Sequence, residues 1–213
     1  MRFDLATQRA RMVDRQLARR GIRNPAVLDA MGTVPREAFV PEVSRHEAYE
    51  DRPLPIGEGQ TISQPYVVAL MIEALSLDAD DRVLEVGAGS GYAAAVLGRI
   101  AREVYAIERH ASLARAASER MGQLGYDNVR VTAGDGTLGW PEEAPFDAIL
   151  VSAGGPEVPE PLLDQLAPGG RLVIPLGEPW KDQELVRLER QAGGAVARES
   201  LGHVRFVPLI GEE

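Results

Sequence analysis

Short apolar runs alternate with longer amphipathic segments from residue 82 onward. The short runs are rich in valine, leucine and isoleucine and predict buried strands, and the segments between them predict helices. The predicted strands cover residues 82–86, 103–108, 128–132, 146–151 and 170–175, and the predicted helices cover about 90–101, 111–124 and 159–167. This alternation is typical of a doubly wound α/β fold, a mostly parallel sheet with helices on both faces.

The pattern changes on either side of this alternating region. Near the start, Met12, Val13 and Leu17 recur close to helical spacing, which predicts an N-terminal helical extension. Near the end, β-type alternation over 184–190 and 204–209 predicts an antiparallel pair at the sheet edge. We expect one domain with three parts: residues 1–81 (helices and a loop), 82–177 (the α/β core) and 178–213 (a β segment).

A glycine-rich turn, Gly87-Ala88-Gly89-Ser90-Gly91, separates the strand over 82–86 from an alanine-rich helix. Glycines at these positions allow a tight turn that presents free N–H groups at the start of the helix. The G-x-G-x-G spacing is one residue shorter than the G-x-G-x-x-G turn that cradles a pyrophosphate. With Glu85 just ahead of the turn, the pattern favours a cofactor that has an amino group and no phosphate, such as S-adenosylmethionine.

Two further acidic residues stand at predicted strand ends. Glu108 follows Gly89 by 108 − 89 = 19 residues, near the ~20-residue offset at which an acidic side chain meets a ribose. Asp135 stands between two glycines, Gly134 and Gly136, where a flat ligand can approach and donate an amino hydrogen. The alternatives are a solvated or capping carboxylate at these strand ends, and, for Glu85, a carboxylate satisfied by backbone N–H groups.

Composition narrows the function classes. The chain has 213 residues, 45% hydrophobic and 26% charged, which indicates a soluble globular protein without a membrane segment. The absence of cysteine excludes disulfides and thiolate chemistry, and three scattered histidines leave little for metal ligation, so we expect no metal. A net charge of −9 argues against nucleic acid as a partner. Seven arginines lie in residues 1–23, and a basic helix face explains them better than a transit peptide does.

A glycine- and proline-rich stretch over residues 51–65 precedes the core. Four uncharged hydrogen-bonding side chains, those of Gln60, Thr61, Ser63 and Gln64, stand just before a helix that Pro65 can open. A loop of this length without secondary structure predicts an active-site loop, with a plain linker as the alternative. For Ser63 the alternative to a functional role is a helix cap.

With these motifs in place, the chain resembles the protein-L-isoaspartate O-methyltransferase family, whose members are class I, Rossmann-like, S-adenosylmethionine-dependent enzymes. The Gln60–Ser63 loop and the Phe206–Leu209 ending are more particular to this family than the glycine turn. The resemblance extends over nearly the whole chain, in the segments Met12–Leu17, Val34–Arg36, Phe39–Pro41, Tyr49–Pro65, Leu84–Tyr92, Val104–Arg109, Gly134–Gly136, Gly139–Pro141, Gly169–Val173, Pro175–Gly177 and Val204–Leu209.

The resemblance implies methyl transfer from S-adenosylmethionine to the free carboxylate of L-isoaspartyl residues, and of D-aspartyl residues in some members, leaving S-adenosylhomocysteine. The ester then closes to a succinimide, whose hydrolysis restores some aspartate. Damaged proteins and peptides are the implied partners, and we expect a cytoplasmic monomer. The implied site comprises catalytic Ser63, substrate contacts at Ile62, Ser63, Val207 and Leu209, and cofactor contacts at Thr61, Glu85, Gly87, Gly89, Ser90, Gly91, Glu108, Arg109, Asp135 and Gly136.

A carboxylate acceptor is already ionised at neutral pH, so we expect Ser63 to orient it and no residue to act as a general base. His46, His110 and His203 are expected to be surface or structural residues. We expect the residues 204–209 to add main-chain hydrogen bonds along an extended peptide. The glycines of Ser152–Gly155 stand where the family usually carries more alanine, and they predict a wider or looser pocket wall.

Two other functions remain open from the sequence. One is a carboxyl methyltransferase for a single dedicated peptide or metabolite, and another is a protein that binds the cofactor or damaged chains without turnover. A nicotinamide oxidoreductase is disfavoured by the glycine spacing and by the lack of an obvious proton-donor pair.

Overall fold

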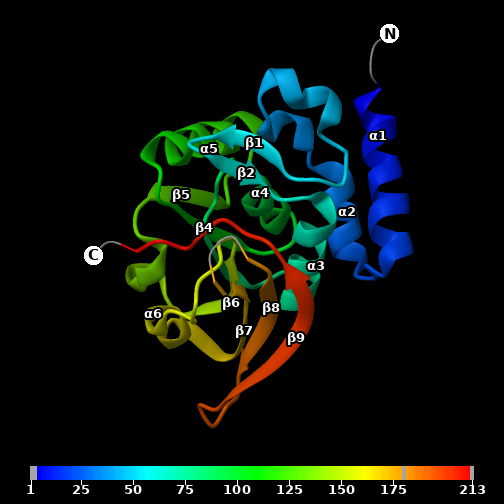
Figure 1. Cartoon of the computed structure of the whole chain (residues 1–213). Coiled ribbons are helices and arrows are strands. Elements are labelled where there is room, and N and C mark those ends of the chain that lie inside the picture. The colour runs from blue at the N-terminus through cyan, green and yellow to red at the C-terminus, as the bar shows by residue number, and fades with distance from the viewer. Residues whose placement is uncertain (1–3, 179–180, 212–213) are drawn as a thin grey trace.

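A computed structural model describes residues 4–178 and 181–211, and a seven-stranded sheet lies at its centre (Figure 1). The sheet has the order β5-β4-β3-β6-β7-β8-β9, with β3 to β7 parallel and β8 and β9 antiparallel to their neighbours. The strands are β3 (Arg82–Val86), β4 (Glu103–Glu108), β5 (Val129–Ala133), β6 (Phe146–Val151), β7 (Leu166–Leu176), β8 (Gln183–Arg190) and β9 (Val196–Val204). The predicted α/β class and the antiparallel edge are confirmed.

Both faces of the sheet are covered because its central strands are apolar on both sides. In β6, Ala148 and Leu150 belong to one buried cluster, whereas Ile149 and Val151 belong to the other. Successive side chains of a strand point to opposite faces, so a continuous apolar run supplies two cores. The covering helices are α3 (Pro65–Leu75), α4 (Tyr92–Gly98), α5 (Ala111–Leu124) and the short α6 (Glu160–Asp164).

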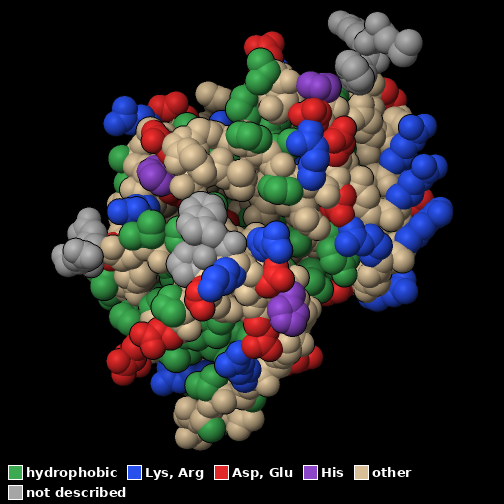
Figure 2. Space-filling view, in the orientation of Figure 1, with side chains coloured by type: hydrophobic (Ala, Val, Ile, Leu, Met, Phe, Trp, Pro, Cys, Tyr) green, Lys and Arg blue, Asp and Glu red, His purple; other side chains and the backbone are tan. Residues whose placement is uncertain are grey.

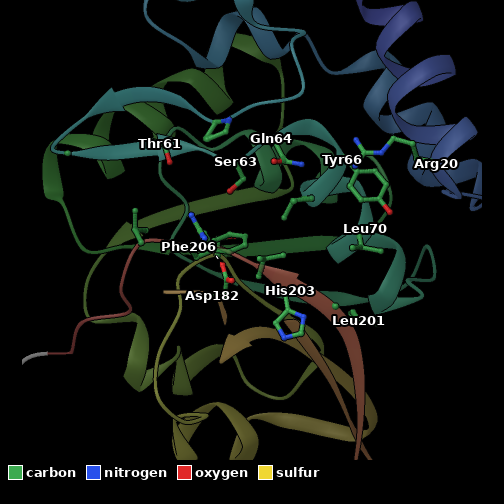
Figure 3. Close-up of a pocket in the computed structure, with 18 residues that line it drawn as sticks. Arg20, Thr61, Ser63, Gln64, Tyr66, Leu70, Asp182, Leu201, His203 and Phe206 are labelled. Carbon is green, nitrogen blue, oxygen red and sulfur yellow. Dashed lines mark hydrogen bonds and ion pairs between the residues drawn. The ribbon is translucent and has the colours of Figure 1, made fainter. Parts of the chain in front are cut away.

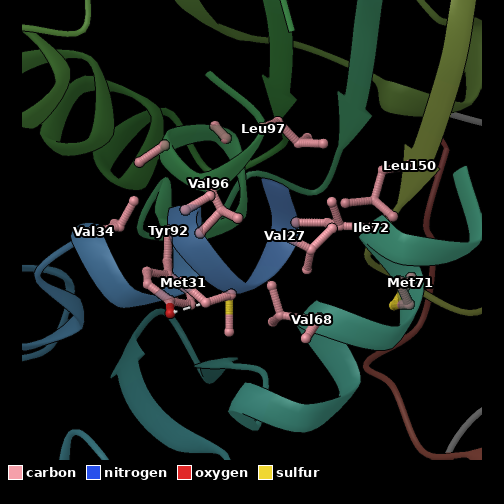
Figure 4. Close-up of a cluster of buried hydrophobic side chains, with 14 of the residues drawn as sticks. Val27, Met31, Val34, Val68, Met71, Ile72, Tyr92, Val96, Leu97 and Leu150 are labelled. Carbon is pink, nitrogen blue, oxygen red and sulfur yellow. Dashed lines mark hydrogen bonds between the residues drawn. The ribbon is translucent and has the colours of Figure 1, made fainter. Parts of the chain in front are cut away.

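The N-terminal extension packs on the face that carries α3 and α4. It comprises α1 (Leu5–Met12), which continues through a π turn (Val13–Leu17) and a 3-10 turn (Ala18–Arg20), then α2 (Pro25–Thr33) and 3-10 turns at Arg36–Phe39 and Glu42–Glu47. Met31 and Tyr92 meet in the shared core, where the Tyr92 hydroxyl lies 3.5 Å from the Met31 sulfur (Figure 4). Met12 and Leu17 are buried, as the helical spacing predicted.

Arginines gather on the solvent side of α1, visible as the basic column at the right of Figure 2. Arg11 of α1, and Arg15 and Arg19 of the turns that follow it, are exposed, which confirms the basic solvated face. No helix in the described part of the chain is long and apolar enough to cross a membrane.

The stretch over residues 51–65 is more ordered than predicted. It contains an antiparallel hairpin of β1 (Leu54–Gly57) and β2 (Gln60–Ile62). Gly57, Glu58 and Gly59 all have positive φ and form its turn. The prediction of a loop without secondary structure is wrong, because Gly-Glu-Gly closes a hairpin as readily as it breaks a strand.

The last strand also differs from its predicted position. The hairpin turn at Gln191–Gly194 leads directly into β9 at Val196, and the strand ends at Val204. The alternating run over 204–209 is therefore not a strand of the sheet, apart from an isolated bridge between Pro208 and Gly154. Proline has no N–H to donate to a ladder. The predicted helix over 90–101 is shorter, as α4, which begins only after Gly91, the last glycine of the turn, with φ of 87°. The predicted helix over 159–167 is shorter, as α6, because Leu166 already pairs with Phe146 in the sheet.

Short 3-10 turns occupy the connection between β5 and β6, at Gly136–Leu138 and Pro141–Glu143. Trp140, between them, packs edge-on against Tyr105 with 5.6 Å between ring centroids. Trp140 is thus a packing residue.

Candidate cofactor and substrate site

The glycine turn adopts the conformation that its sequence predicted. Gly87, Gly89 and Gly91 have φ values of 87°, 53° and 87°. The N–H groups of Gly87 and Ala88 both donate to the carbonyl oxygen of Ile107, at 2.8 and 3.1 Å, which ties the turn to β4. Positive φ is strained for residues with a Cβ, so glycine is required.

Glu108, at the end of β4, holds the same turn through its carboxylate. Oε2 accepts the Gly89 N–H at 2.8 Å and Oε1 accepts the His110 N–H at 2.9 Å. His110 is the N-cap residue of α5, which agrees with the predicted structural role for that histidine. Each carboxylate oxygen can accept a second hydrogen bond, so a ribose contact at Glu108 remains compatible with these bonds and stays a prediction.

Glu85 is buried with one oxygen unpaired. Its side chain is 1% exposed, Oε1 lies 3.4 Å from the Ser152 hydroxyl, and Oε2 has no hydrogen-bond partner among the residues that the structure describes. Burial, reinforced by the nearby charge of Glu108, raises the pKa of Glu85 to about 8. No backbone N–H in the described part of the chain meets hydrogen-bond geometry with Oε2, so the alternative of a carboxylate fully satisfied by backbone N–H groups is wrong. A buried, unpaired carboxylate oxygen suits a cationic ligand group.

A small cavity of about 40 Å³ lies beside Glu85. Ser90 lines it, and the buried hydroxyl of this residue also lacks a partner among the described residues. An ammonium group beside Glu85 and a hydrogen-bonding group beside Ser90 would satisfy both orphaned atoms, so these residues fit the amino-acid end of S-adenosylmethionine. The predicted site residues that line the cavity are Thr61, Ile62, Ser63, Glu85, Gly87, Gly89 and Ser90.

A larger groove of about 900 Å³ adjoins this cavity (Figure 3). Thr61, Ser63 and Ser152 line both spaces, so they stand where the two meet. The apolar side of the groove comes from α3 and from the end of β9 and the residues after it: Tyr66, Val67, Leu70, Leu201, Val204, Phe206 and Val207.

The hydroxyl of Ser63 has no hydrogen-bond partner among the described residues, and Figure 3 shows it pointing into the groove. The N-cap of α3 is Gln64, with no side-chain capping bond, and Pro65 occupies the first turn. The capping alternative for Ser63 is therefore wrong. Its carbonyl oxygen accepts a hydrogen bond from Arg36 Nη2 at 2.8 Å.

The other predicted cofactor residues line neither cavity. Gly91 is the N-cap of α4, and Arg109 is exposed directly after β4. Asp135 accepts hydrogen bonds from the Thr137 N–H and hydroxyl at 2.8 and 2.7 Å. A Cβ on Gly136 would lie 2.4 Å from Val86 Cγ1, so glycine lets this loop approach β3. Their cofactor contacts remain predictions.

The predicted substrate residues separate in the structure. Val207 lines the groove, whereas Ile62 lines the small cavity. Leu209 packs against the second apolar cluster. The Gly154 N–H donates to the Val207 carbonyl oxygen at 2.8 Å, and the Leu209 N–H donates to the Gly154 carbonyl oxygen at 2.7 Å.

The expected widening at Ser152–Gly155 is wrong. The space that a side chain at Gly154 would fill is taken by the Gln183 amide, 2.3 Å from the position of a Cβ. A Cβ on Gly155 would lie in contact with the Glu157 carbonyl oxygen and with Leu209, at 3.5 and 3.8 Å. Neither glycine lines the groove, and only Ser152 of this stretch does.

Sequence reasoning missed several groove residues. Tyr66 and Leu70 are four residues apart on α3 and only partly buried, a spacing that marks one helix face. Arg20 lies over the Tyr66 ring at 3.7 Å from the centroid and forms an ion pair with Asp51. No local signal in the sequence indicates Arg20, because its partners come from 31 and 46 residues away (51 − 20 and 66 − 20).

A sheet of this order, with a glycine turn, an acidic strand end and an unpaired buried carboxylate at the edge of β3, β4 and β5, defines an S-adenosylmethionine-dependent methyltransferase. The profile of the family described as protein-L-isoaspartate(D-aspartate) O-methyltransferase matches residues 7–213. The chain belongs to this family.

Related proteins agree over nearly the whole chain. Protein-L-isoaspartate O-methyltransferase 2 of Pelobacter propionicus is 61% identical over 202 residues, which are 95% of this chain and 90% of the relative. A protein-L-isoaspartate O-methyltransferase of Rhodopseudomonas palustris is 60% identical over 98% of this chain and 85% of the relative.

Two solved structures are also similar. One, a protein-L-isoaspartate O-methyltransferase, has a TM-score of 0.85 and 32% identity over 95% of this chain and 66% of its own. The other, described as a Plasmodium falciparum protein of the family in complex with S-adenosyl-L-homocysteine, has a TM-score of 0.81 and 30% identity over 95% of this chain and 98% of its own.

Proposed function

We propose that this protein methylates the free carboxylate of L-isoaspartyl residues in damaged proteins, with S-adenosylmethionine as donor and Ser63 as the residue that orients the acceptor. The observation that carries the proposal is the position of Ser63. Its unpartnered hydroxyl stands at the junction of the small cavity beside Glu85 and the large groove. With the cofactor in the small cavity and the acceptor in the groove, a methyl group crossing from one to the other would pass this junction.

The cofactor supplies an electrophilic methyl group on a sulfonium. In this chain Glu85 and Ser90 would hold its amino-acid end, because both carry orphaned buried oxygens. Glu108 would accept hydrogen bonds from the ribose hydroxyls, and Asp135 from the adenine amino group. Gly87 and Gly89 let the turn approach closely, and Thr61 would contact the same ligand from the hairpin side.

The acceptor needs no general base, since a carboxylate with a pKa near ~4 is ionised at neutral pH. Ser63 would donate a hydrogen bond to one carboxylate oxygen and leave the other directed at the methyl group. Holding the reacting atoms in line at ~3 Å accounts for much of the rate enhancement that such a site can give. The apolar groove wall displaces water from the carboxylate, which strengthens this hydrogen bond.

The product ester would then close to a succinimide by attack of the neighbouring backbone nitrogen, with methanol leaving, and hydrolysis of the succinimide would return part of the material as aspartate. We also propose that the protein acts in the cytoplasm as a monomer and does not bind nucleic acid. The net charge of −9 supports the last point.

Paired synthetic peptides that differ only in L-isoaspartyl or L-aspartyl at one position test this function. Labelled methyl from S-adenosylmethionine should enter several unrelated isoaspartyl peptides and not their aspartyl counterparts. Labelling of one peptide alone would favour a dedicated carboxyl methyltransferase. Cofactor binding without labelling of any isoaspartyl peptide would refute the proposal and favour a binding protein.

A further inference from the structure

A buried glutamine holds the chain where it leaves β9. Gln183 begins β8, is 0% exposed, and is paired in register with Val204, the last residue of β9. The backbone ladder between β8 and β9 ends at Val204, and beyond it the side-chain amide of Gln183 takes the place of a pairing backbone. Oε1 accepts the Phe206 N–H at 2.8 Å, and Nε2 donates to the Phe206 carbonyl oxygen at 3.5 Å. One primary amide thus presents the acceptor and the donor that a neighbouring strand would present.

Gly154 supplies the next anchor and the space for this amide. The Gly154 N–H donates to the carbonyl oxygen of Val207, the residue after Phe206, and the Gly154 carbonyl oxygen accepts the Leu209 N–H. A Cβ on Gly154 would lie 2.3 Å from Gln183 Nε2 and 2.6 Å from Cδ. An alanine would therefore push the amide off Phe206, because the side chain is packed and has no room to withdraw.

The segment held in this way forms part of the groove wall. Phe206 and Val207 line the groove that Ser63 enters from the opposite side (Figure 3). Gln183 itself lines neither the groove nor the small cavity. We infer that Gln183 is a positioning residue for peptide binding, which fixes the Phe206–Val207 wall, and that Gly154 is the small residue that admits it. This inference rests on the proposed function.

The chain contains a matched control. Gln165 is also buried, its Oε1 accepts the Trp140 N–H at 2.7 Å, and its Nε2 donates to the Leu138 carbonyl oxygen at 2.8 Å. A Cβ on the intervening Gly139 would lie 2.3 Å from Gln165 Oε1. The contacts are of the same kind, but the segment they hold lines neither cavity.

The first experiment compares Gln183→Met with Gln165→Met. Both changes keep the length of the unbranched side chain and remove the two hydrogen bonds of its amide, so both should lower Tm. At saturating S-adenosylmethionine, Gln183→Met should raise the KM for an isoaspartyl peptide about tenfold, the rise expected when the released wall occupies its binding-competent position about a tenth of the time. Its kcat should change less, and its Kd for S-adenosylhomocysteine should equal that of the wild type. Gln165→Met should leave the peptide KM unchanged.

An unchanged peptide KM in Gln183→Met, or an equal rise in Gln165→Met, would overturn the positioning role. A wild-type protein that labels no isoaspartyl peptide would instead refute the proposed function, so the two failures are distinct. The Kd for S-adenosylhomocysteine shows in each case that the variant is folded.

A second set of variants tests the contact with Gly154. Gly154→Ala should raise the peptide KM in the wild-type background, because its methyl group displaces the amide. In a Gln183→Ala background the same methyl group enters vacated space and should raise the KM no further. Fold-changes that multiply across the two backgrounds would show that Gly154 acts independently of Gln183 and would overturn the inference.

Discussion

Arg36 Nη2 donates a hydrogen bond to the carbonyl oxygen of Ser63 at 2.8 Å, from a guanidinium that is fully buried. The Nε of the same group donates to the Ala48 carbonyl oxygen at 2.7 Å, and its plane lies over the Tyr92 ring. Arg36 therefore joins the N-terminal extension, the segment before the hairpin and the residue proposed to orient the acceptor. Arg36 is inside the protein and lines neither cavity, but it contacts Ser63 and Tyr92, which line the small one.

Replacing Arg36 with lysine should affect both stability and catalysis. A lysine cannot present two donors in the fixed geometry of a guanidinium, so at least one buried carbonyl loses its partner. We expect the free energy of unfolding to fall by about 1–3 kcal/mol, and kcat/KM to fall because Ser63 is held less firmly. Urea denaturation and methyl-transfer kinetics measure the two effects.

Arg9→Lys provides the control. Arg9 also bonds a backbone carbonyl, that of Thr33, and contacts Glu37 and Tyr49, but not the Ser63 segment. It should lower stability with kcat/KM unchanged. Equal losses of kcat/KM in the two variants would refute a specific link between Arg36 and Ser63.

Removing the hydroxyl of Ser63 should slow methyl transfer without weakening cofactor binding. We expect Ser63→Ala to lower kcat/KM for isoaspartyl peptides about 10- to 100-fold, the usual worth of a hydrogen bond to a charged group. Isothermal titration with S-adenosylhomocysteine should give the wild-type Kd. A variant with wild-type kcat/KM would exclude an orienting role.

Cofactor binding should release a proton from Glu85. The pKa of this carboxyl is about 8, raised first by burial, so it is mostly protonated at pH 7. An ammonium group beside it favours the ionised form, and binding at pH 7 should therefore release about one proton and strengthen as the pH rises toward 8. Titrations of S-adenosylhomocysteine in two buffers of different ionisation enthalpy measure this release, which Glu85→Gln should abolish together with most of the affinity.

The same group gives a pH dependence of stability without ligand. The folded-state pKa of Glu85 is about 8 against an ordinary value of 4.5, so between these pH values the folded state keeps a proton that the unfolded state has lost. The wild type should lose stability relative to Glu85→Gln as the pH rises from 4.5 to 8, and no further above 8. Thermal denaturation of both proteins across this range is the check, and parallel curves would be the contrary result.

An alanine at Gly136 should be costly, because its Cβ would meet Val86 Cγ1 at 2.4 Å. We expect a loss of about 1–3 kcal/mol in the free energy of unfolding, partly recovered when Val86→Ala is added. Gly122→Ala is the matched control, since a Cβ at that helical position in α5 meets nothing within 4 Å and should stabilise by about 0.5–1 kcal/mol. Equal destabilisation by both alanines would contradict the contact.

Proline at position 207 should weaken peptide binding selectively. The Val207 carbonyl oxygen is used by Gly154, whereas its N–H has no hydrogen-bond partner in the described part of the chain. That N–H is available to a peptide main chain along the groove. Val207→Pro should raise the peptide KM far more than the Kd for S-adenosylhomocysteine, and equal effects on both would count against such a contact.

The strand-end residues of the site could be predicted from the sequence because parallel strands bring their carboxyl ends to one edge of the sheet. Glu85, the glycine turn and Glu108 each follow an apolar run, so their order along the chain maps onto their neighbourhood in space. Their hydrogen bonds could not be predicted. The Glu108 carboxylate accepts the N–H groups of Gly89 and His110, and this depends on how β3 and β4 are aligned.

The groove was harder to predict because its walls come from segments far apart in the chain. Ser152, Tyr66 and the end of β9 carry no shared local pattern. The alternation over 204–209 indicated a strand, but a strand forms only where its backbone pairs with a neighbouring strand. Here the backbone bonds instead to the Gln183 side chain and to Gly154. The hairpin over Leu54–Ile62 was not predicted because its glycines suggested an open loop, although the two strands do pair.

The sheet ends at β9, whose outer main-chain groups face no further strand in the described residues. Such an edge is a template for uncontrolled pairing between molecules. In β9, Arg198 and Glu199 carry charges that are paired with Glu184 and Arg187 of β8, and the register shifts beside Leu201. Charged side chains and a bulge oppose the continuous ladder that aggregation needs. If the protein acts on damaged chains as proposed, these features would keep the edge beside its groove from pairing with them.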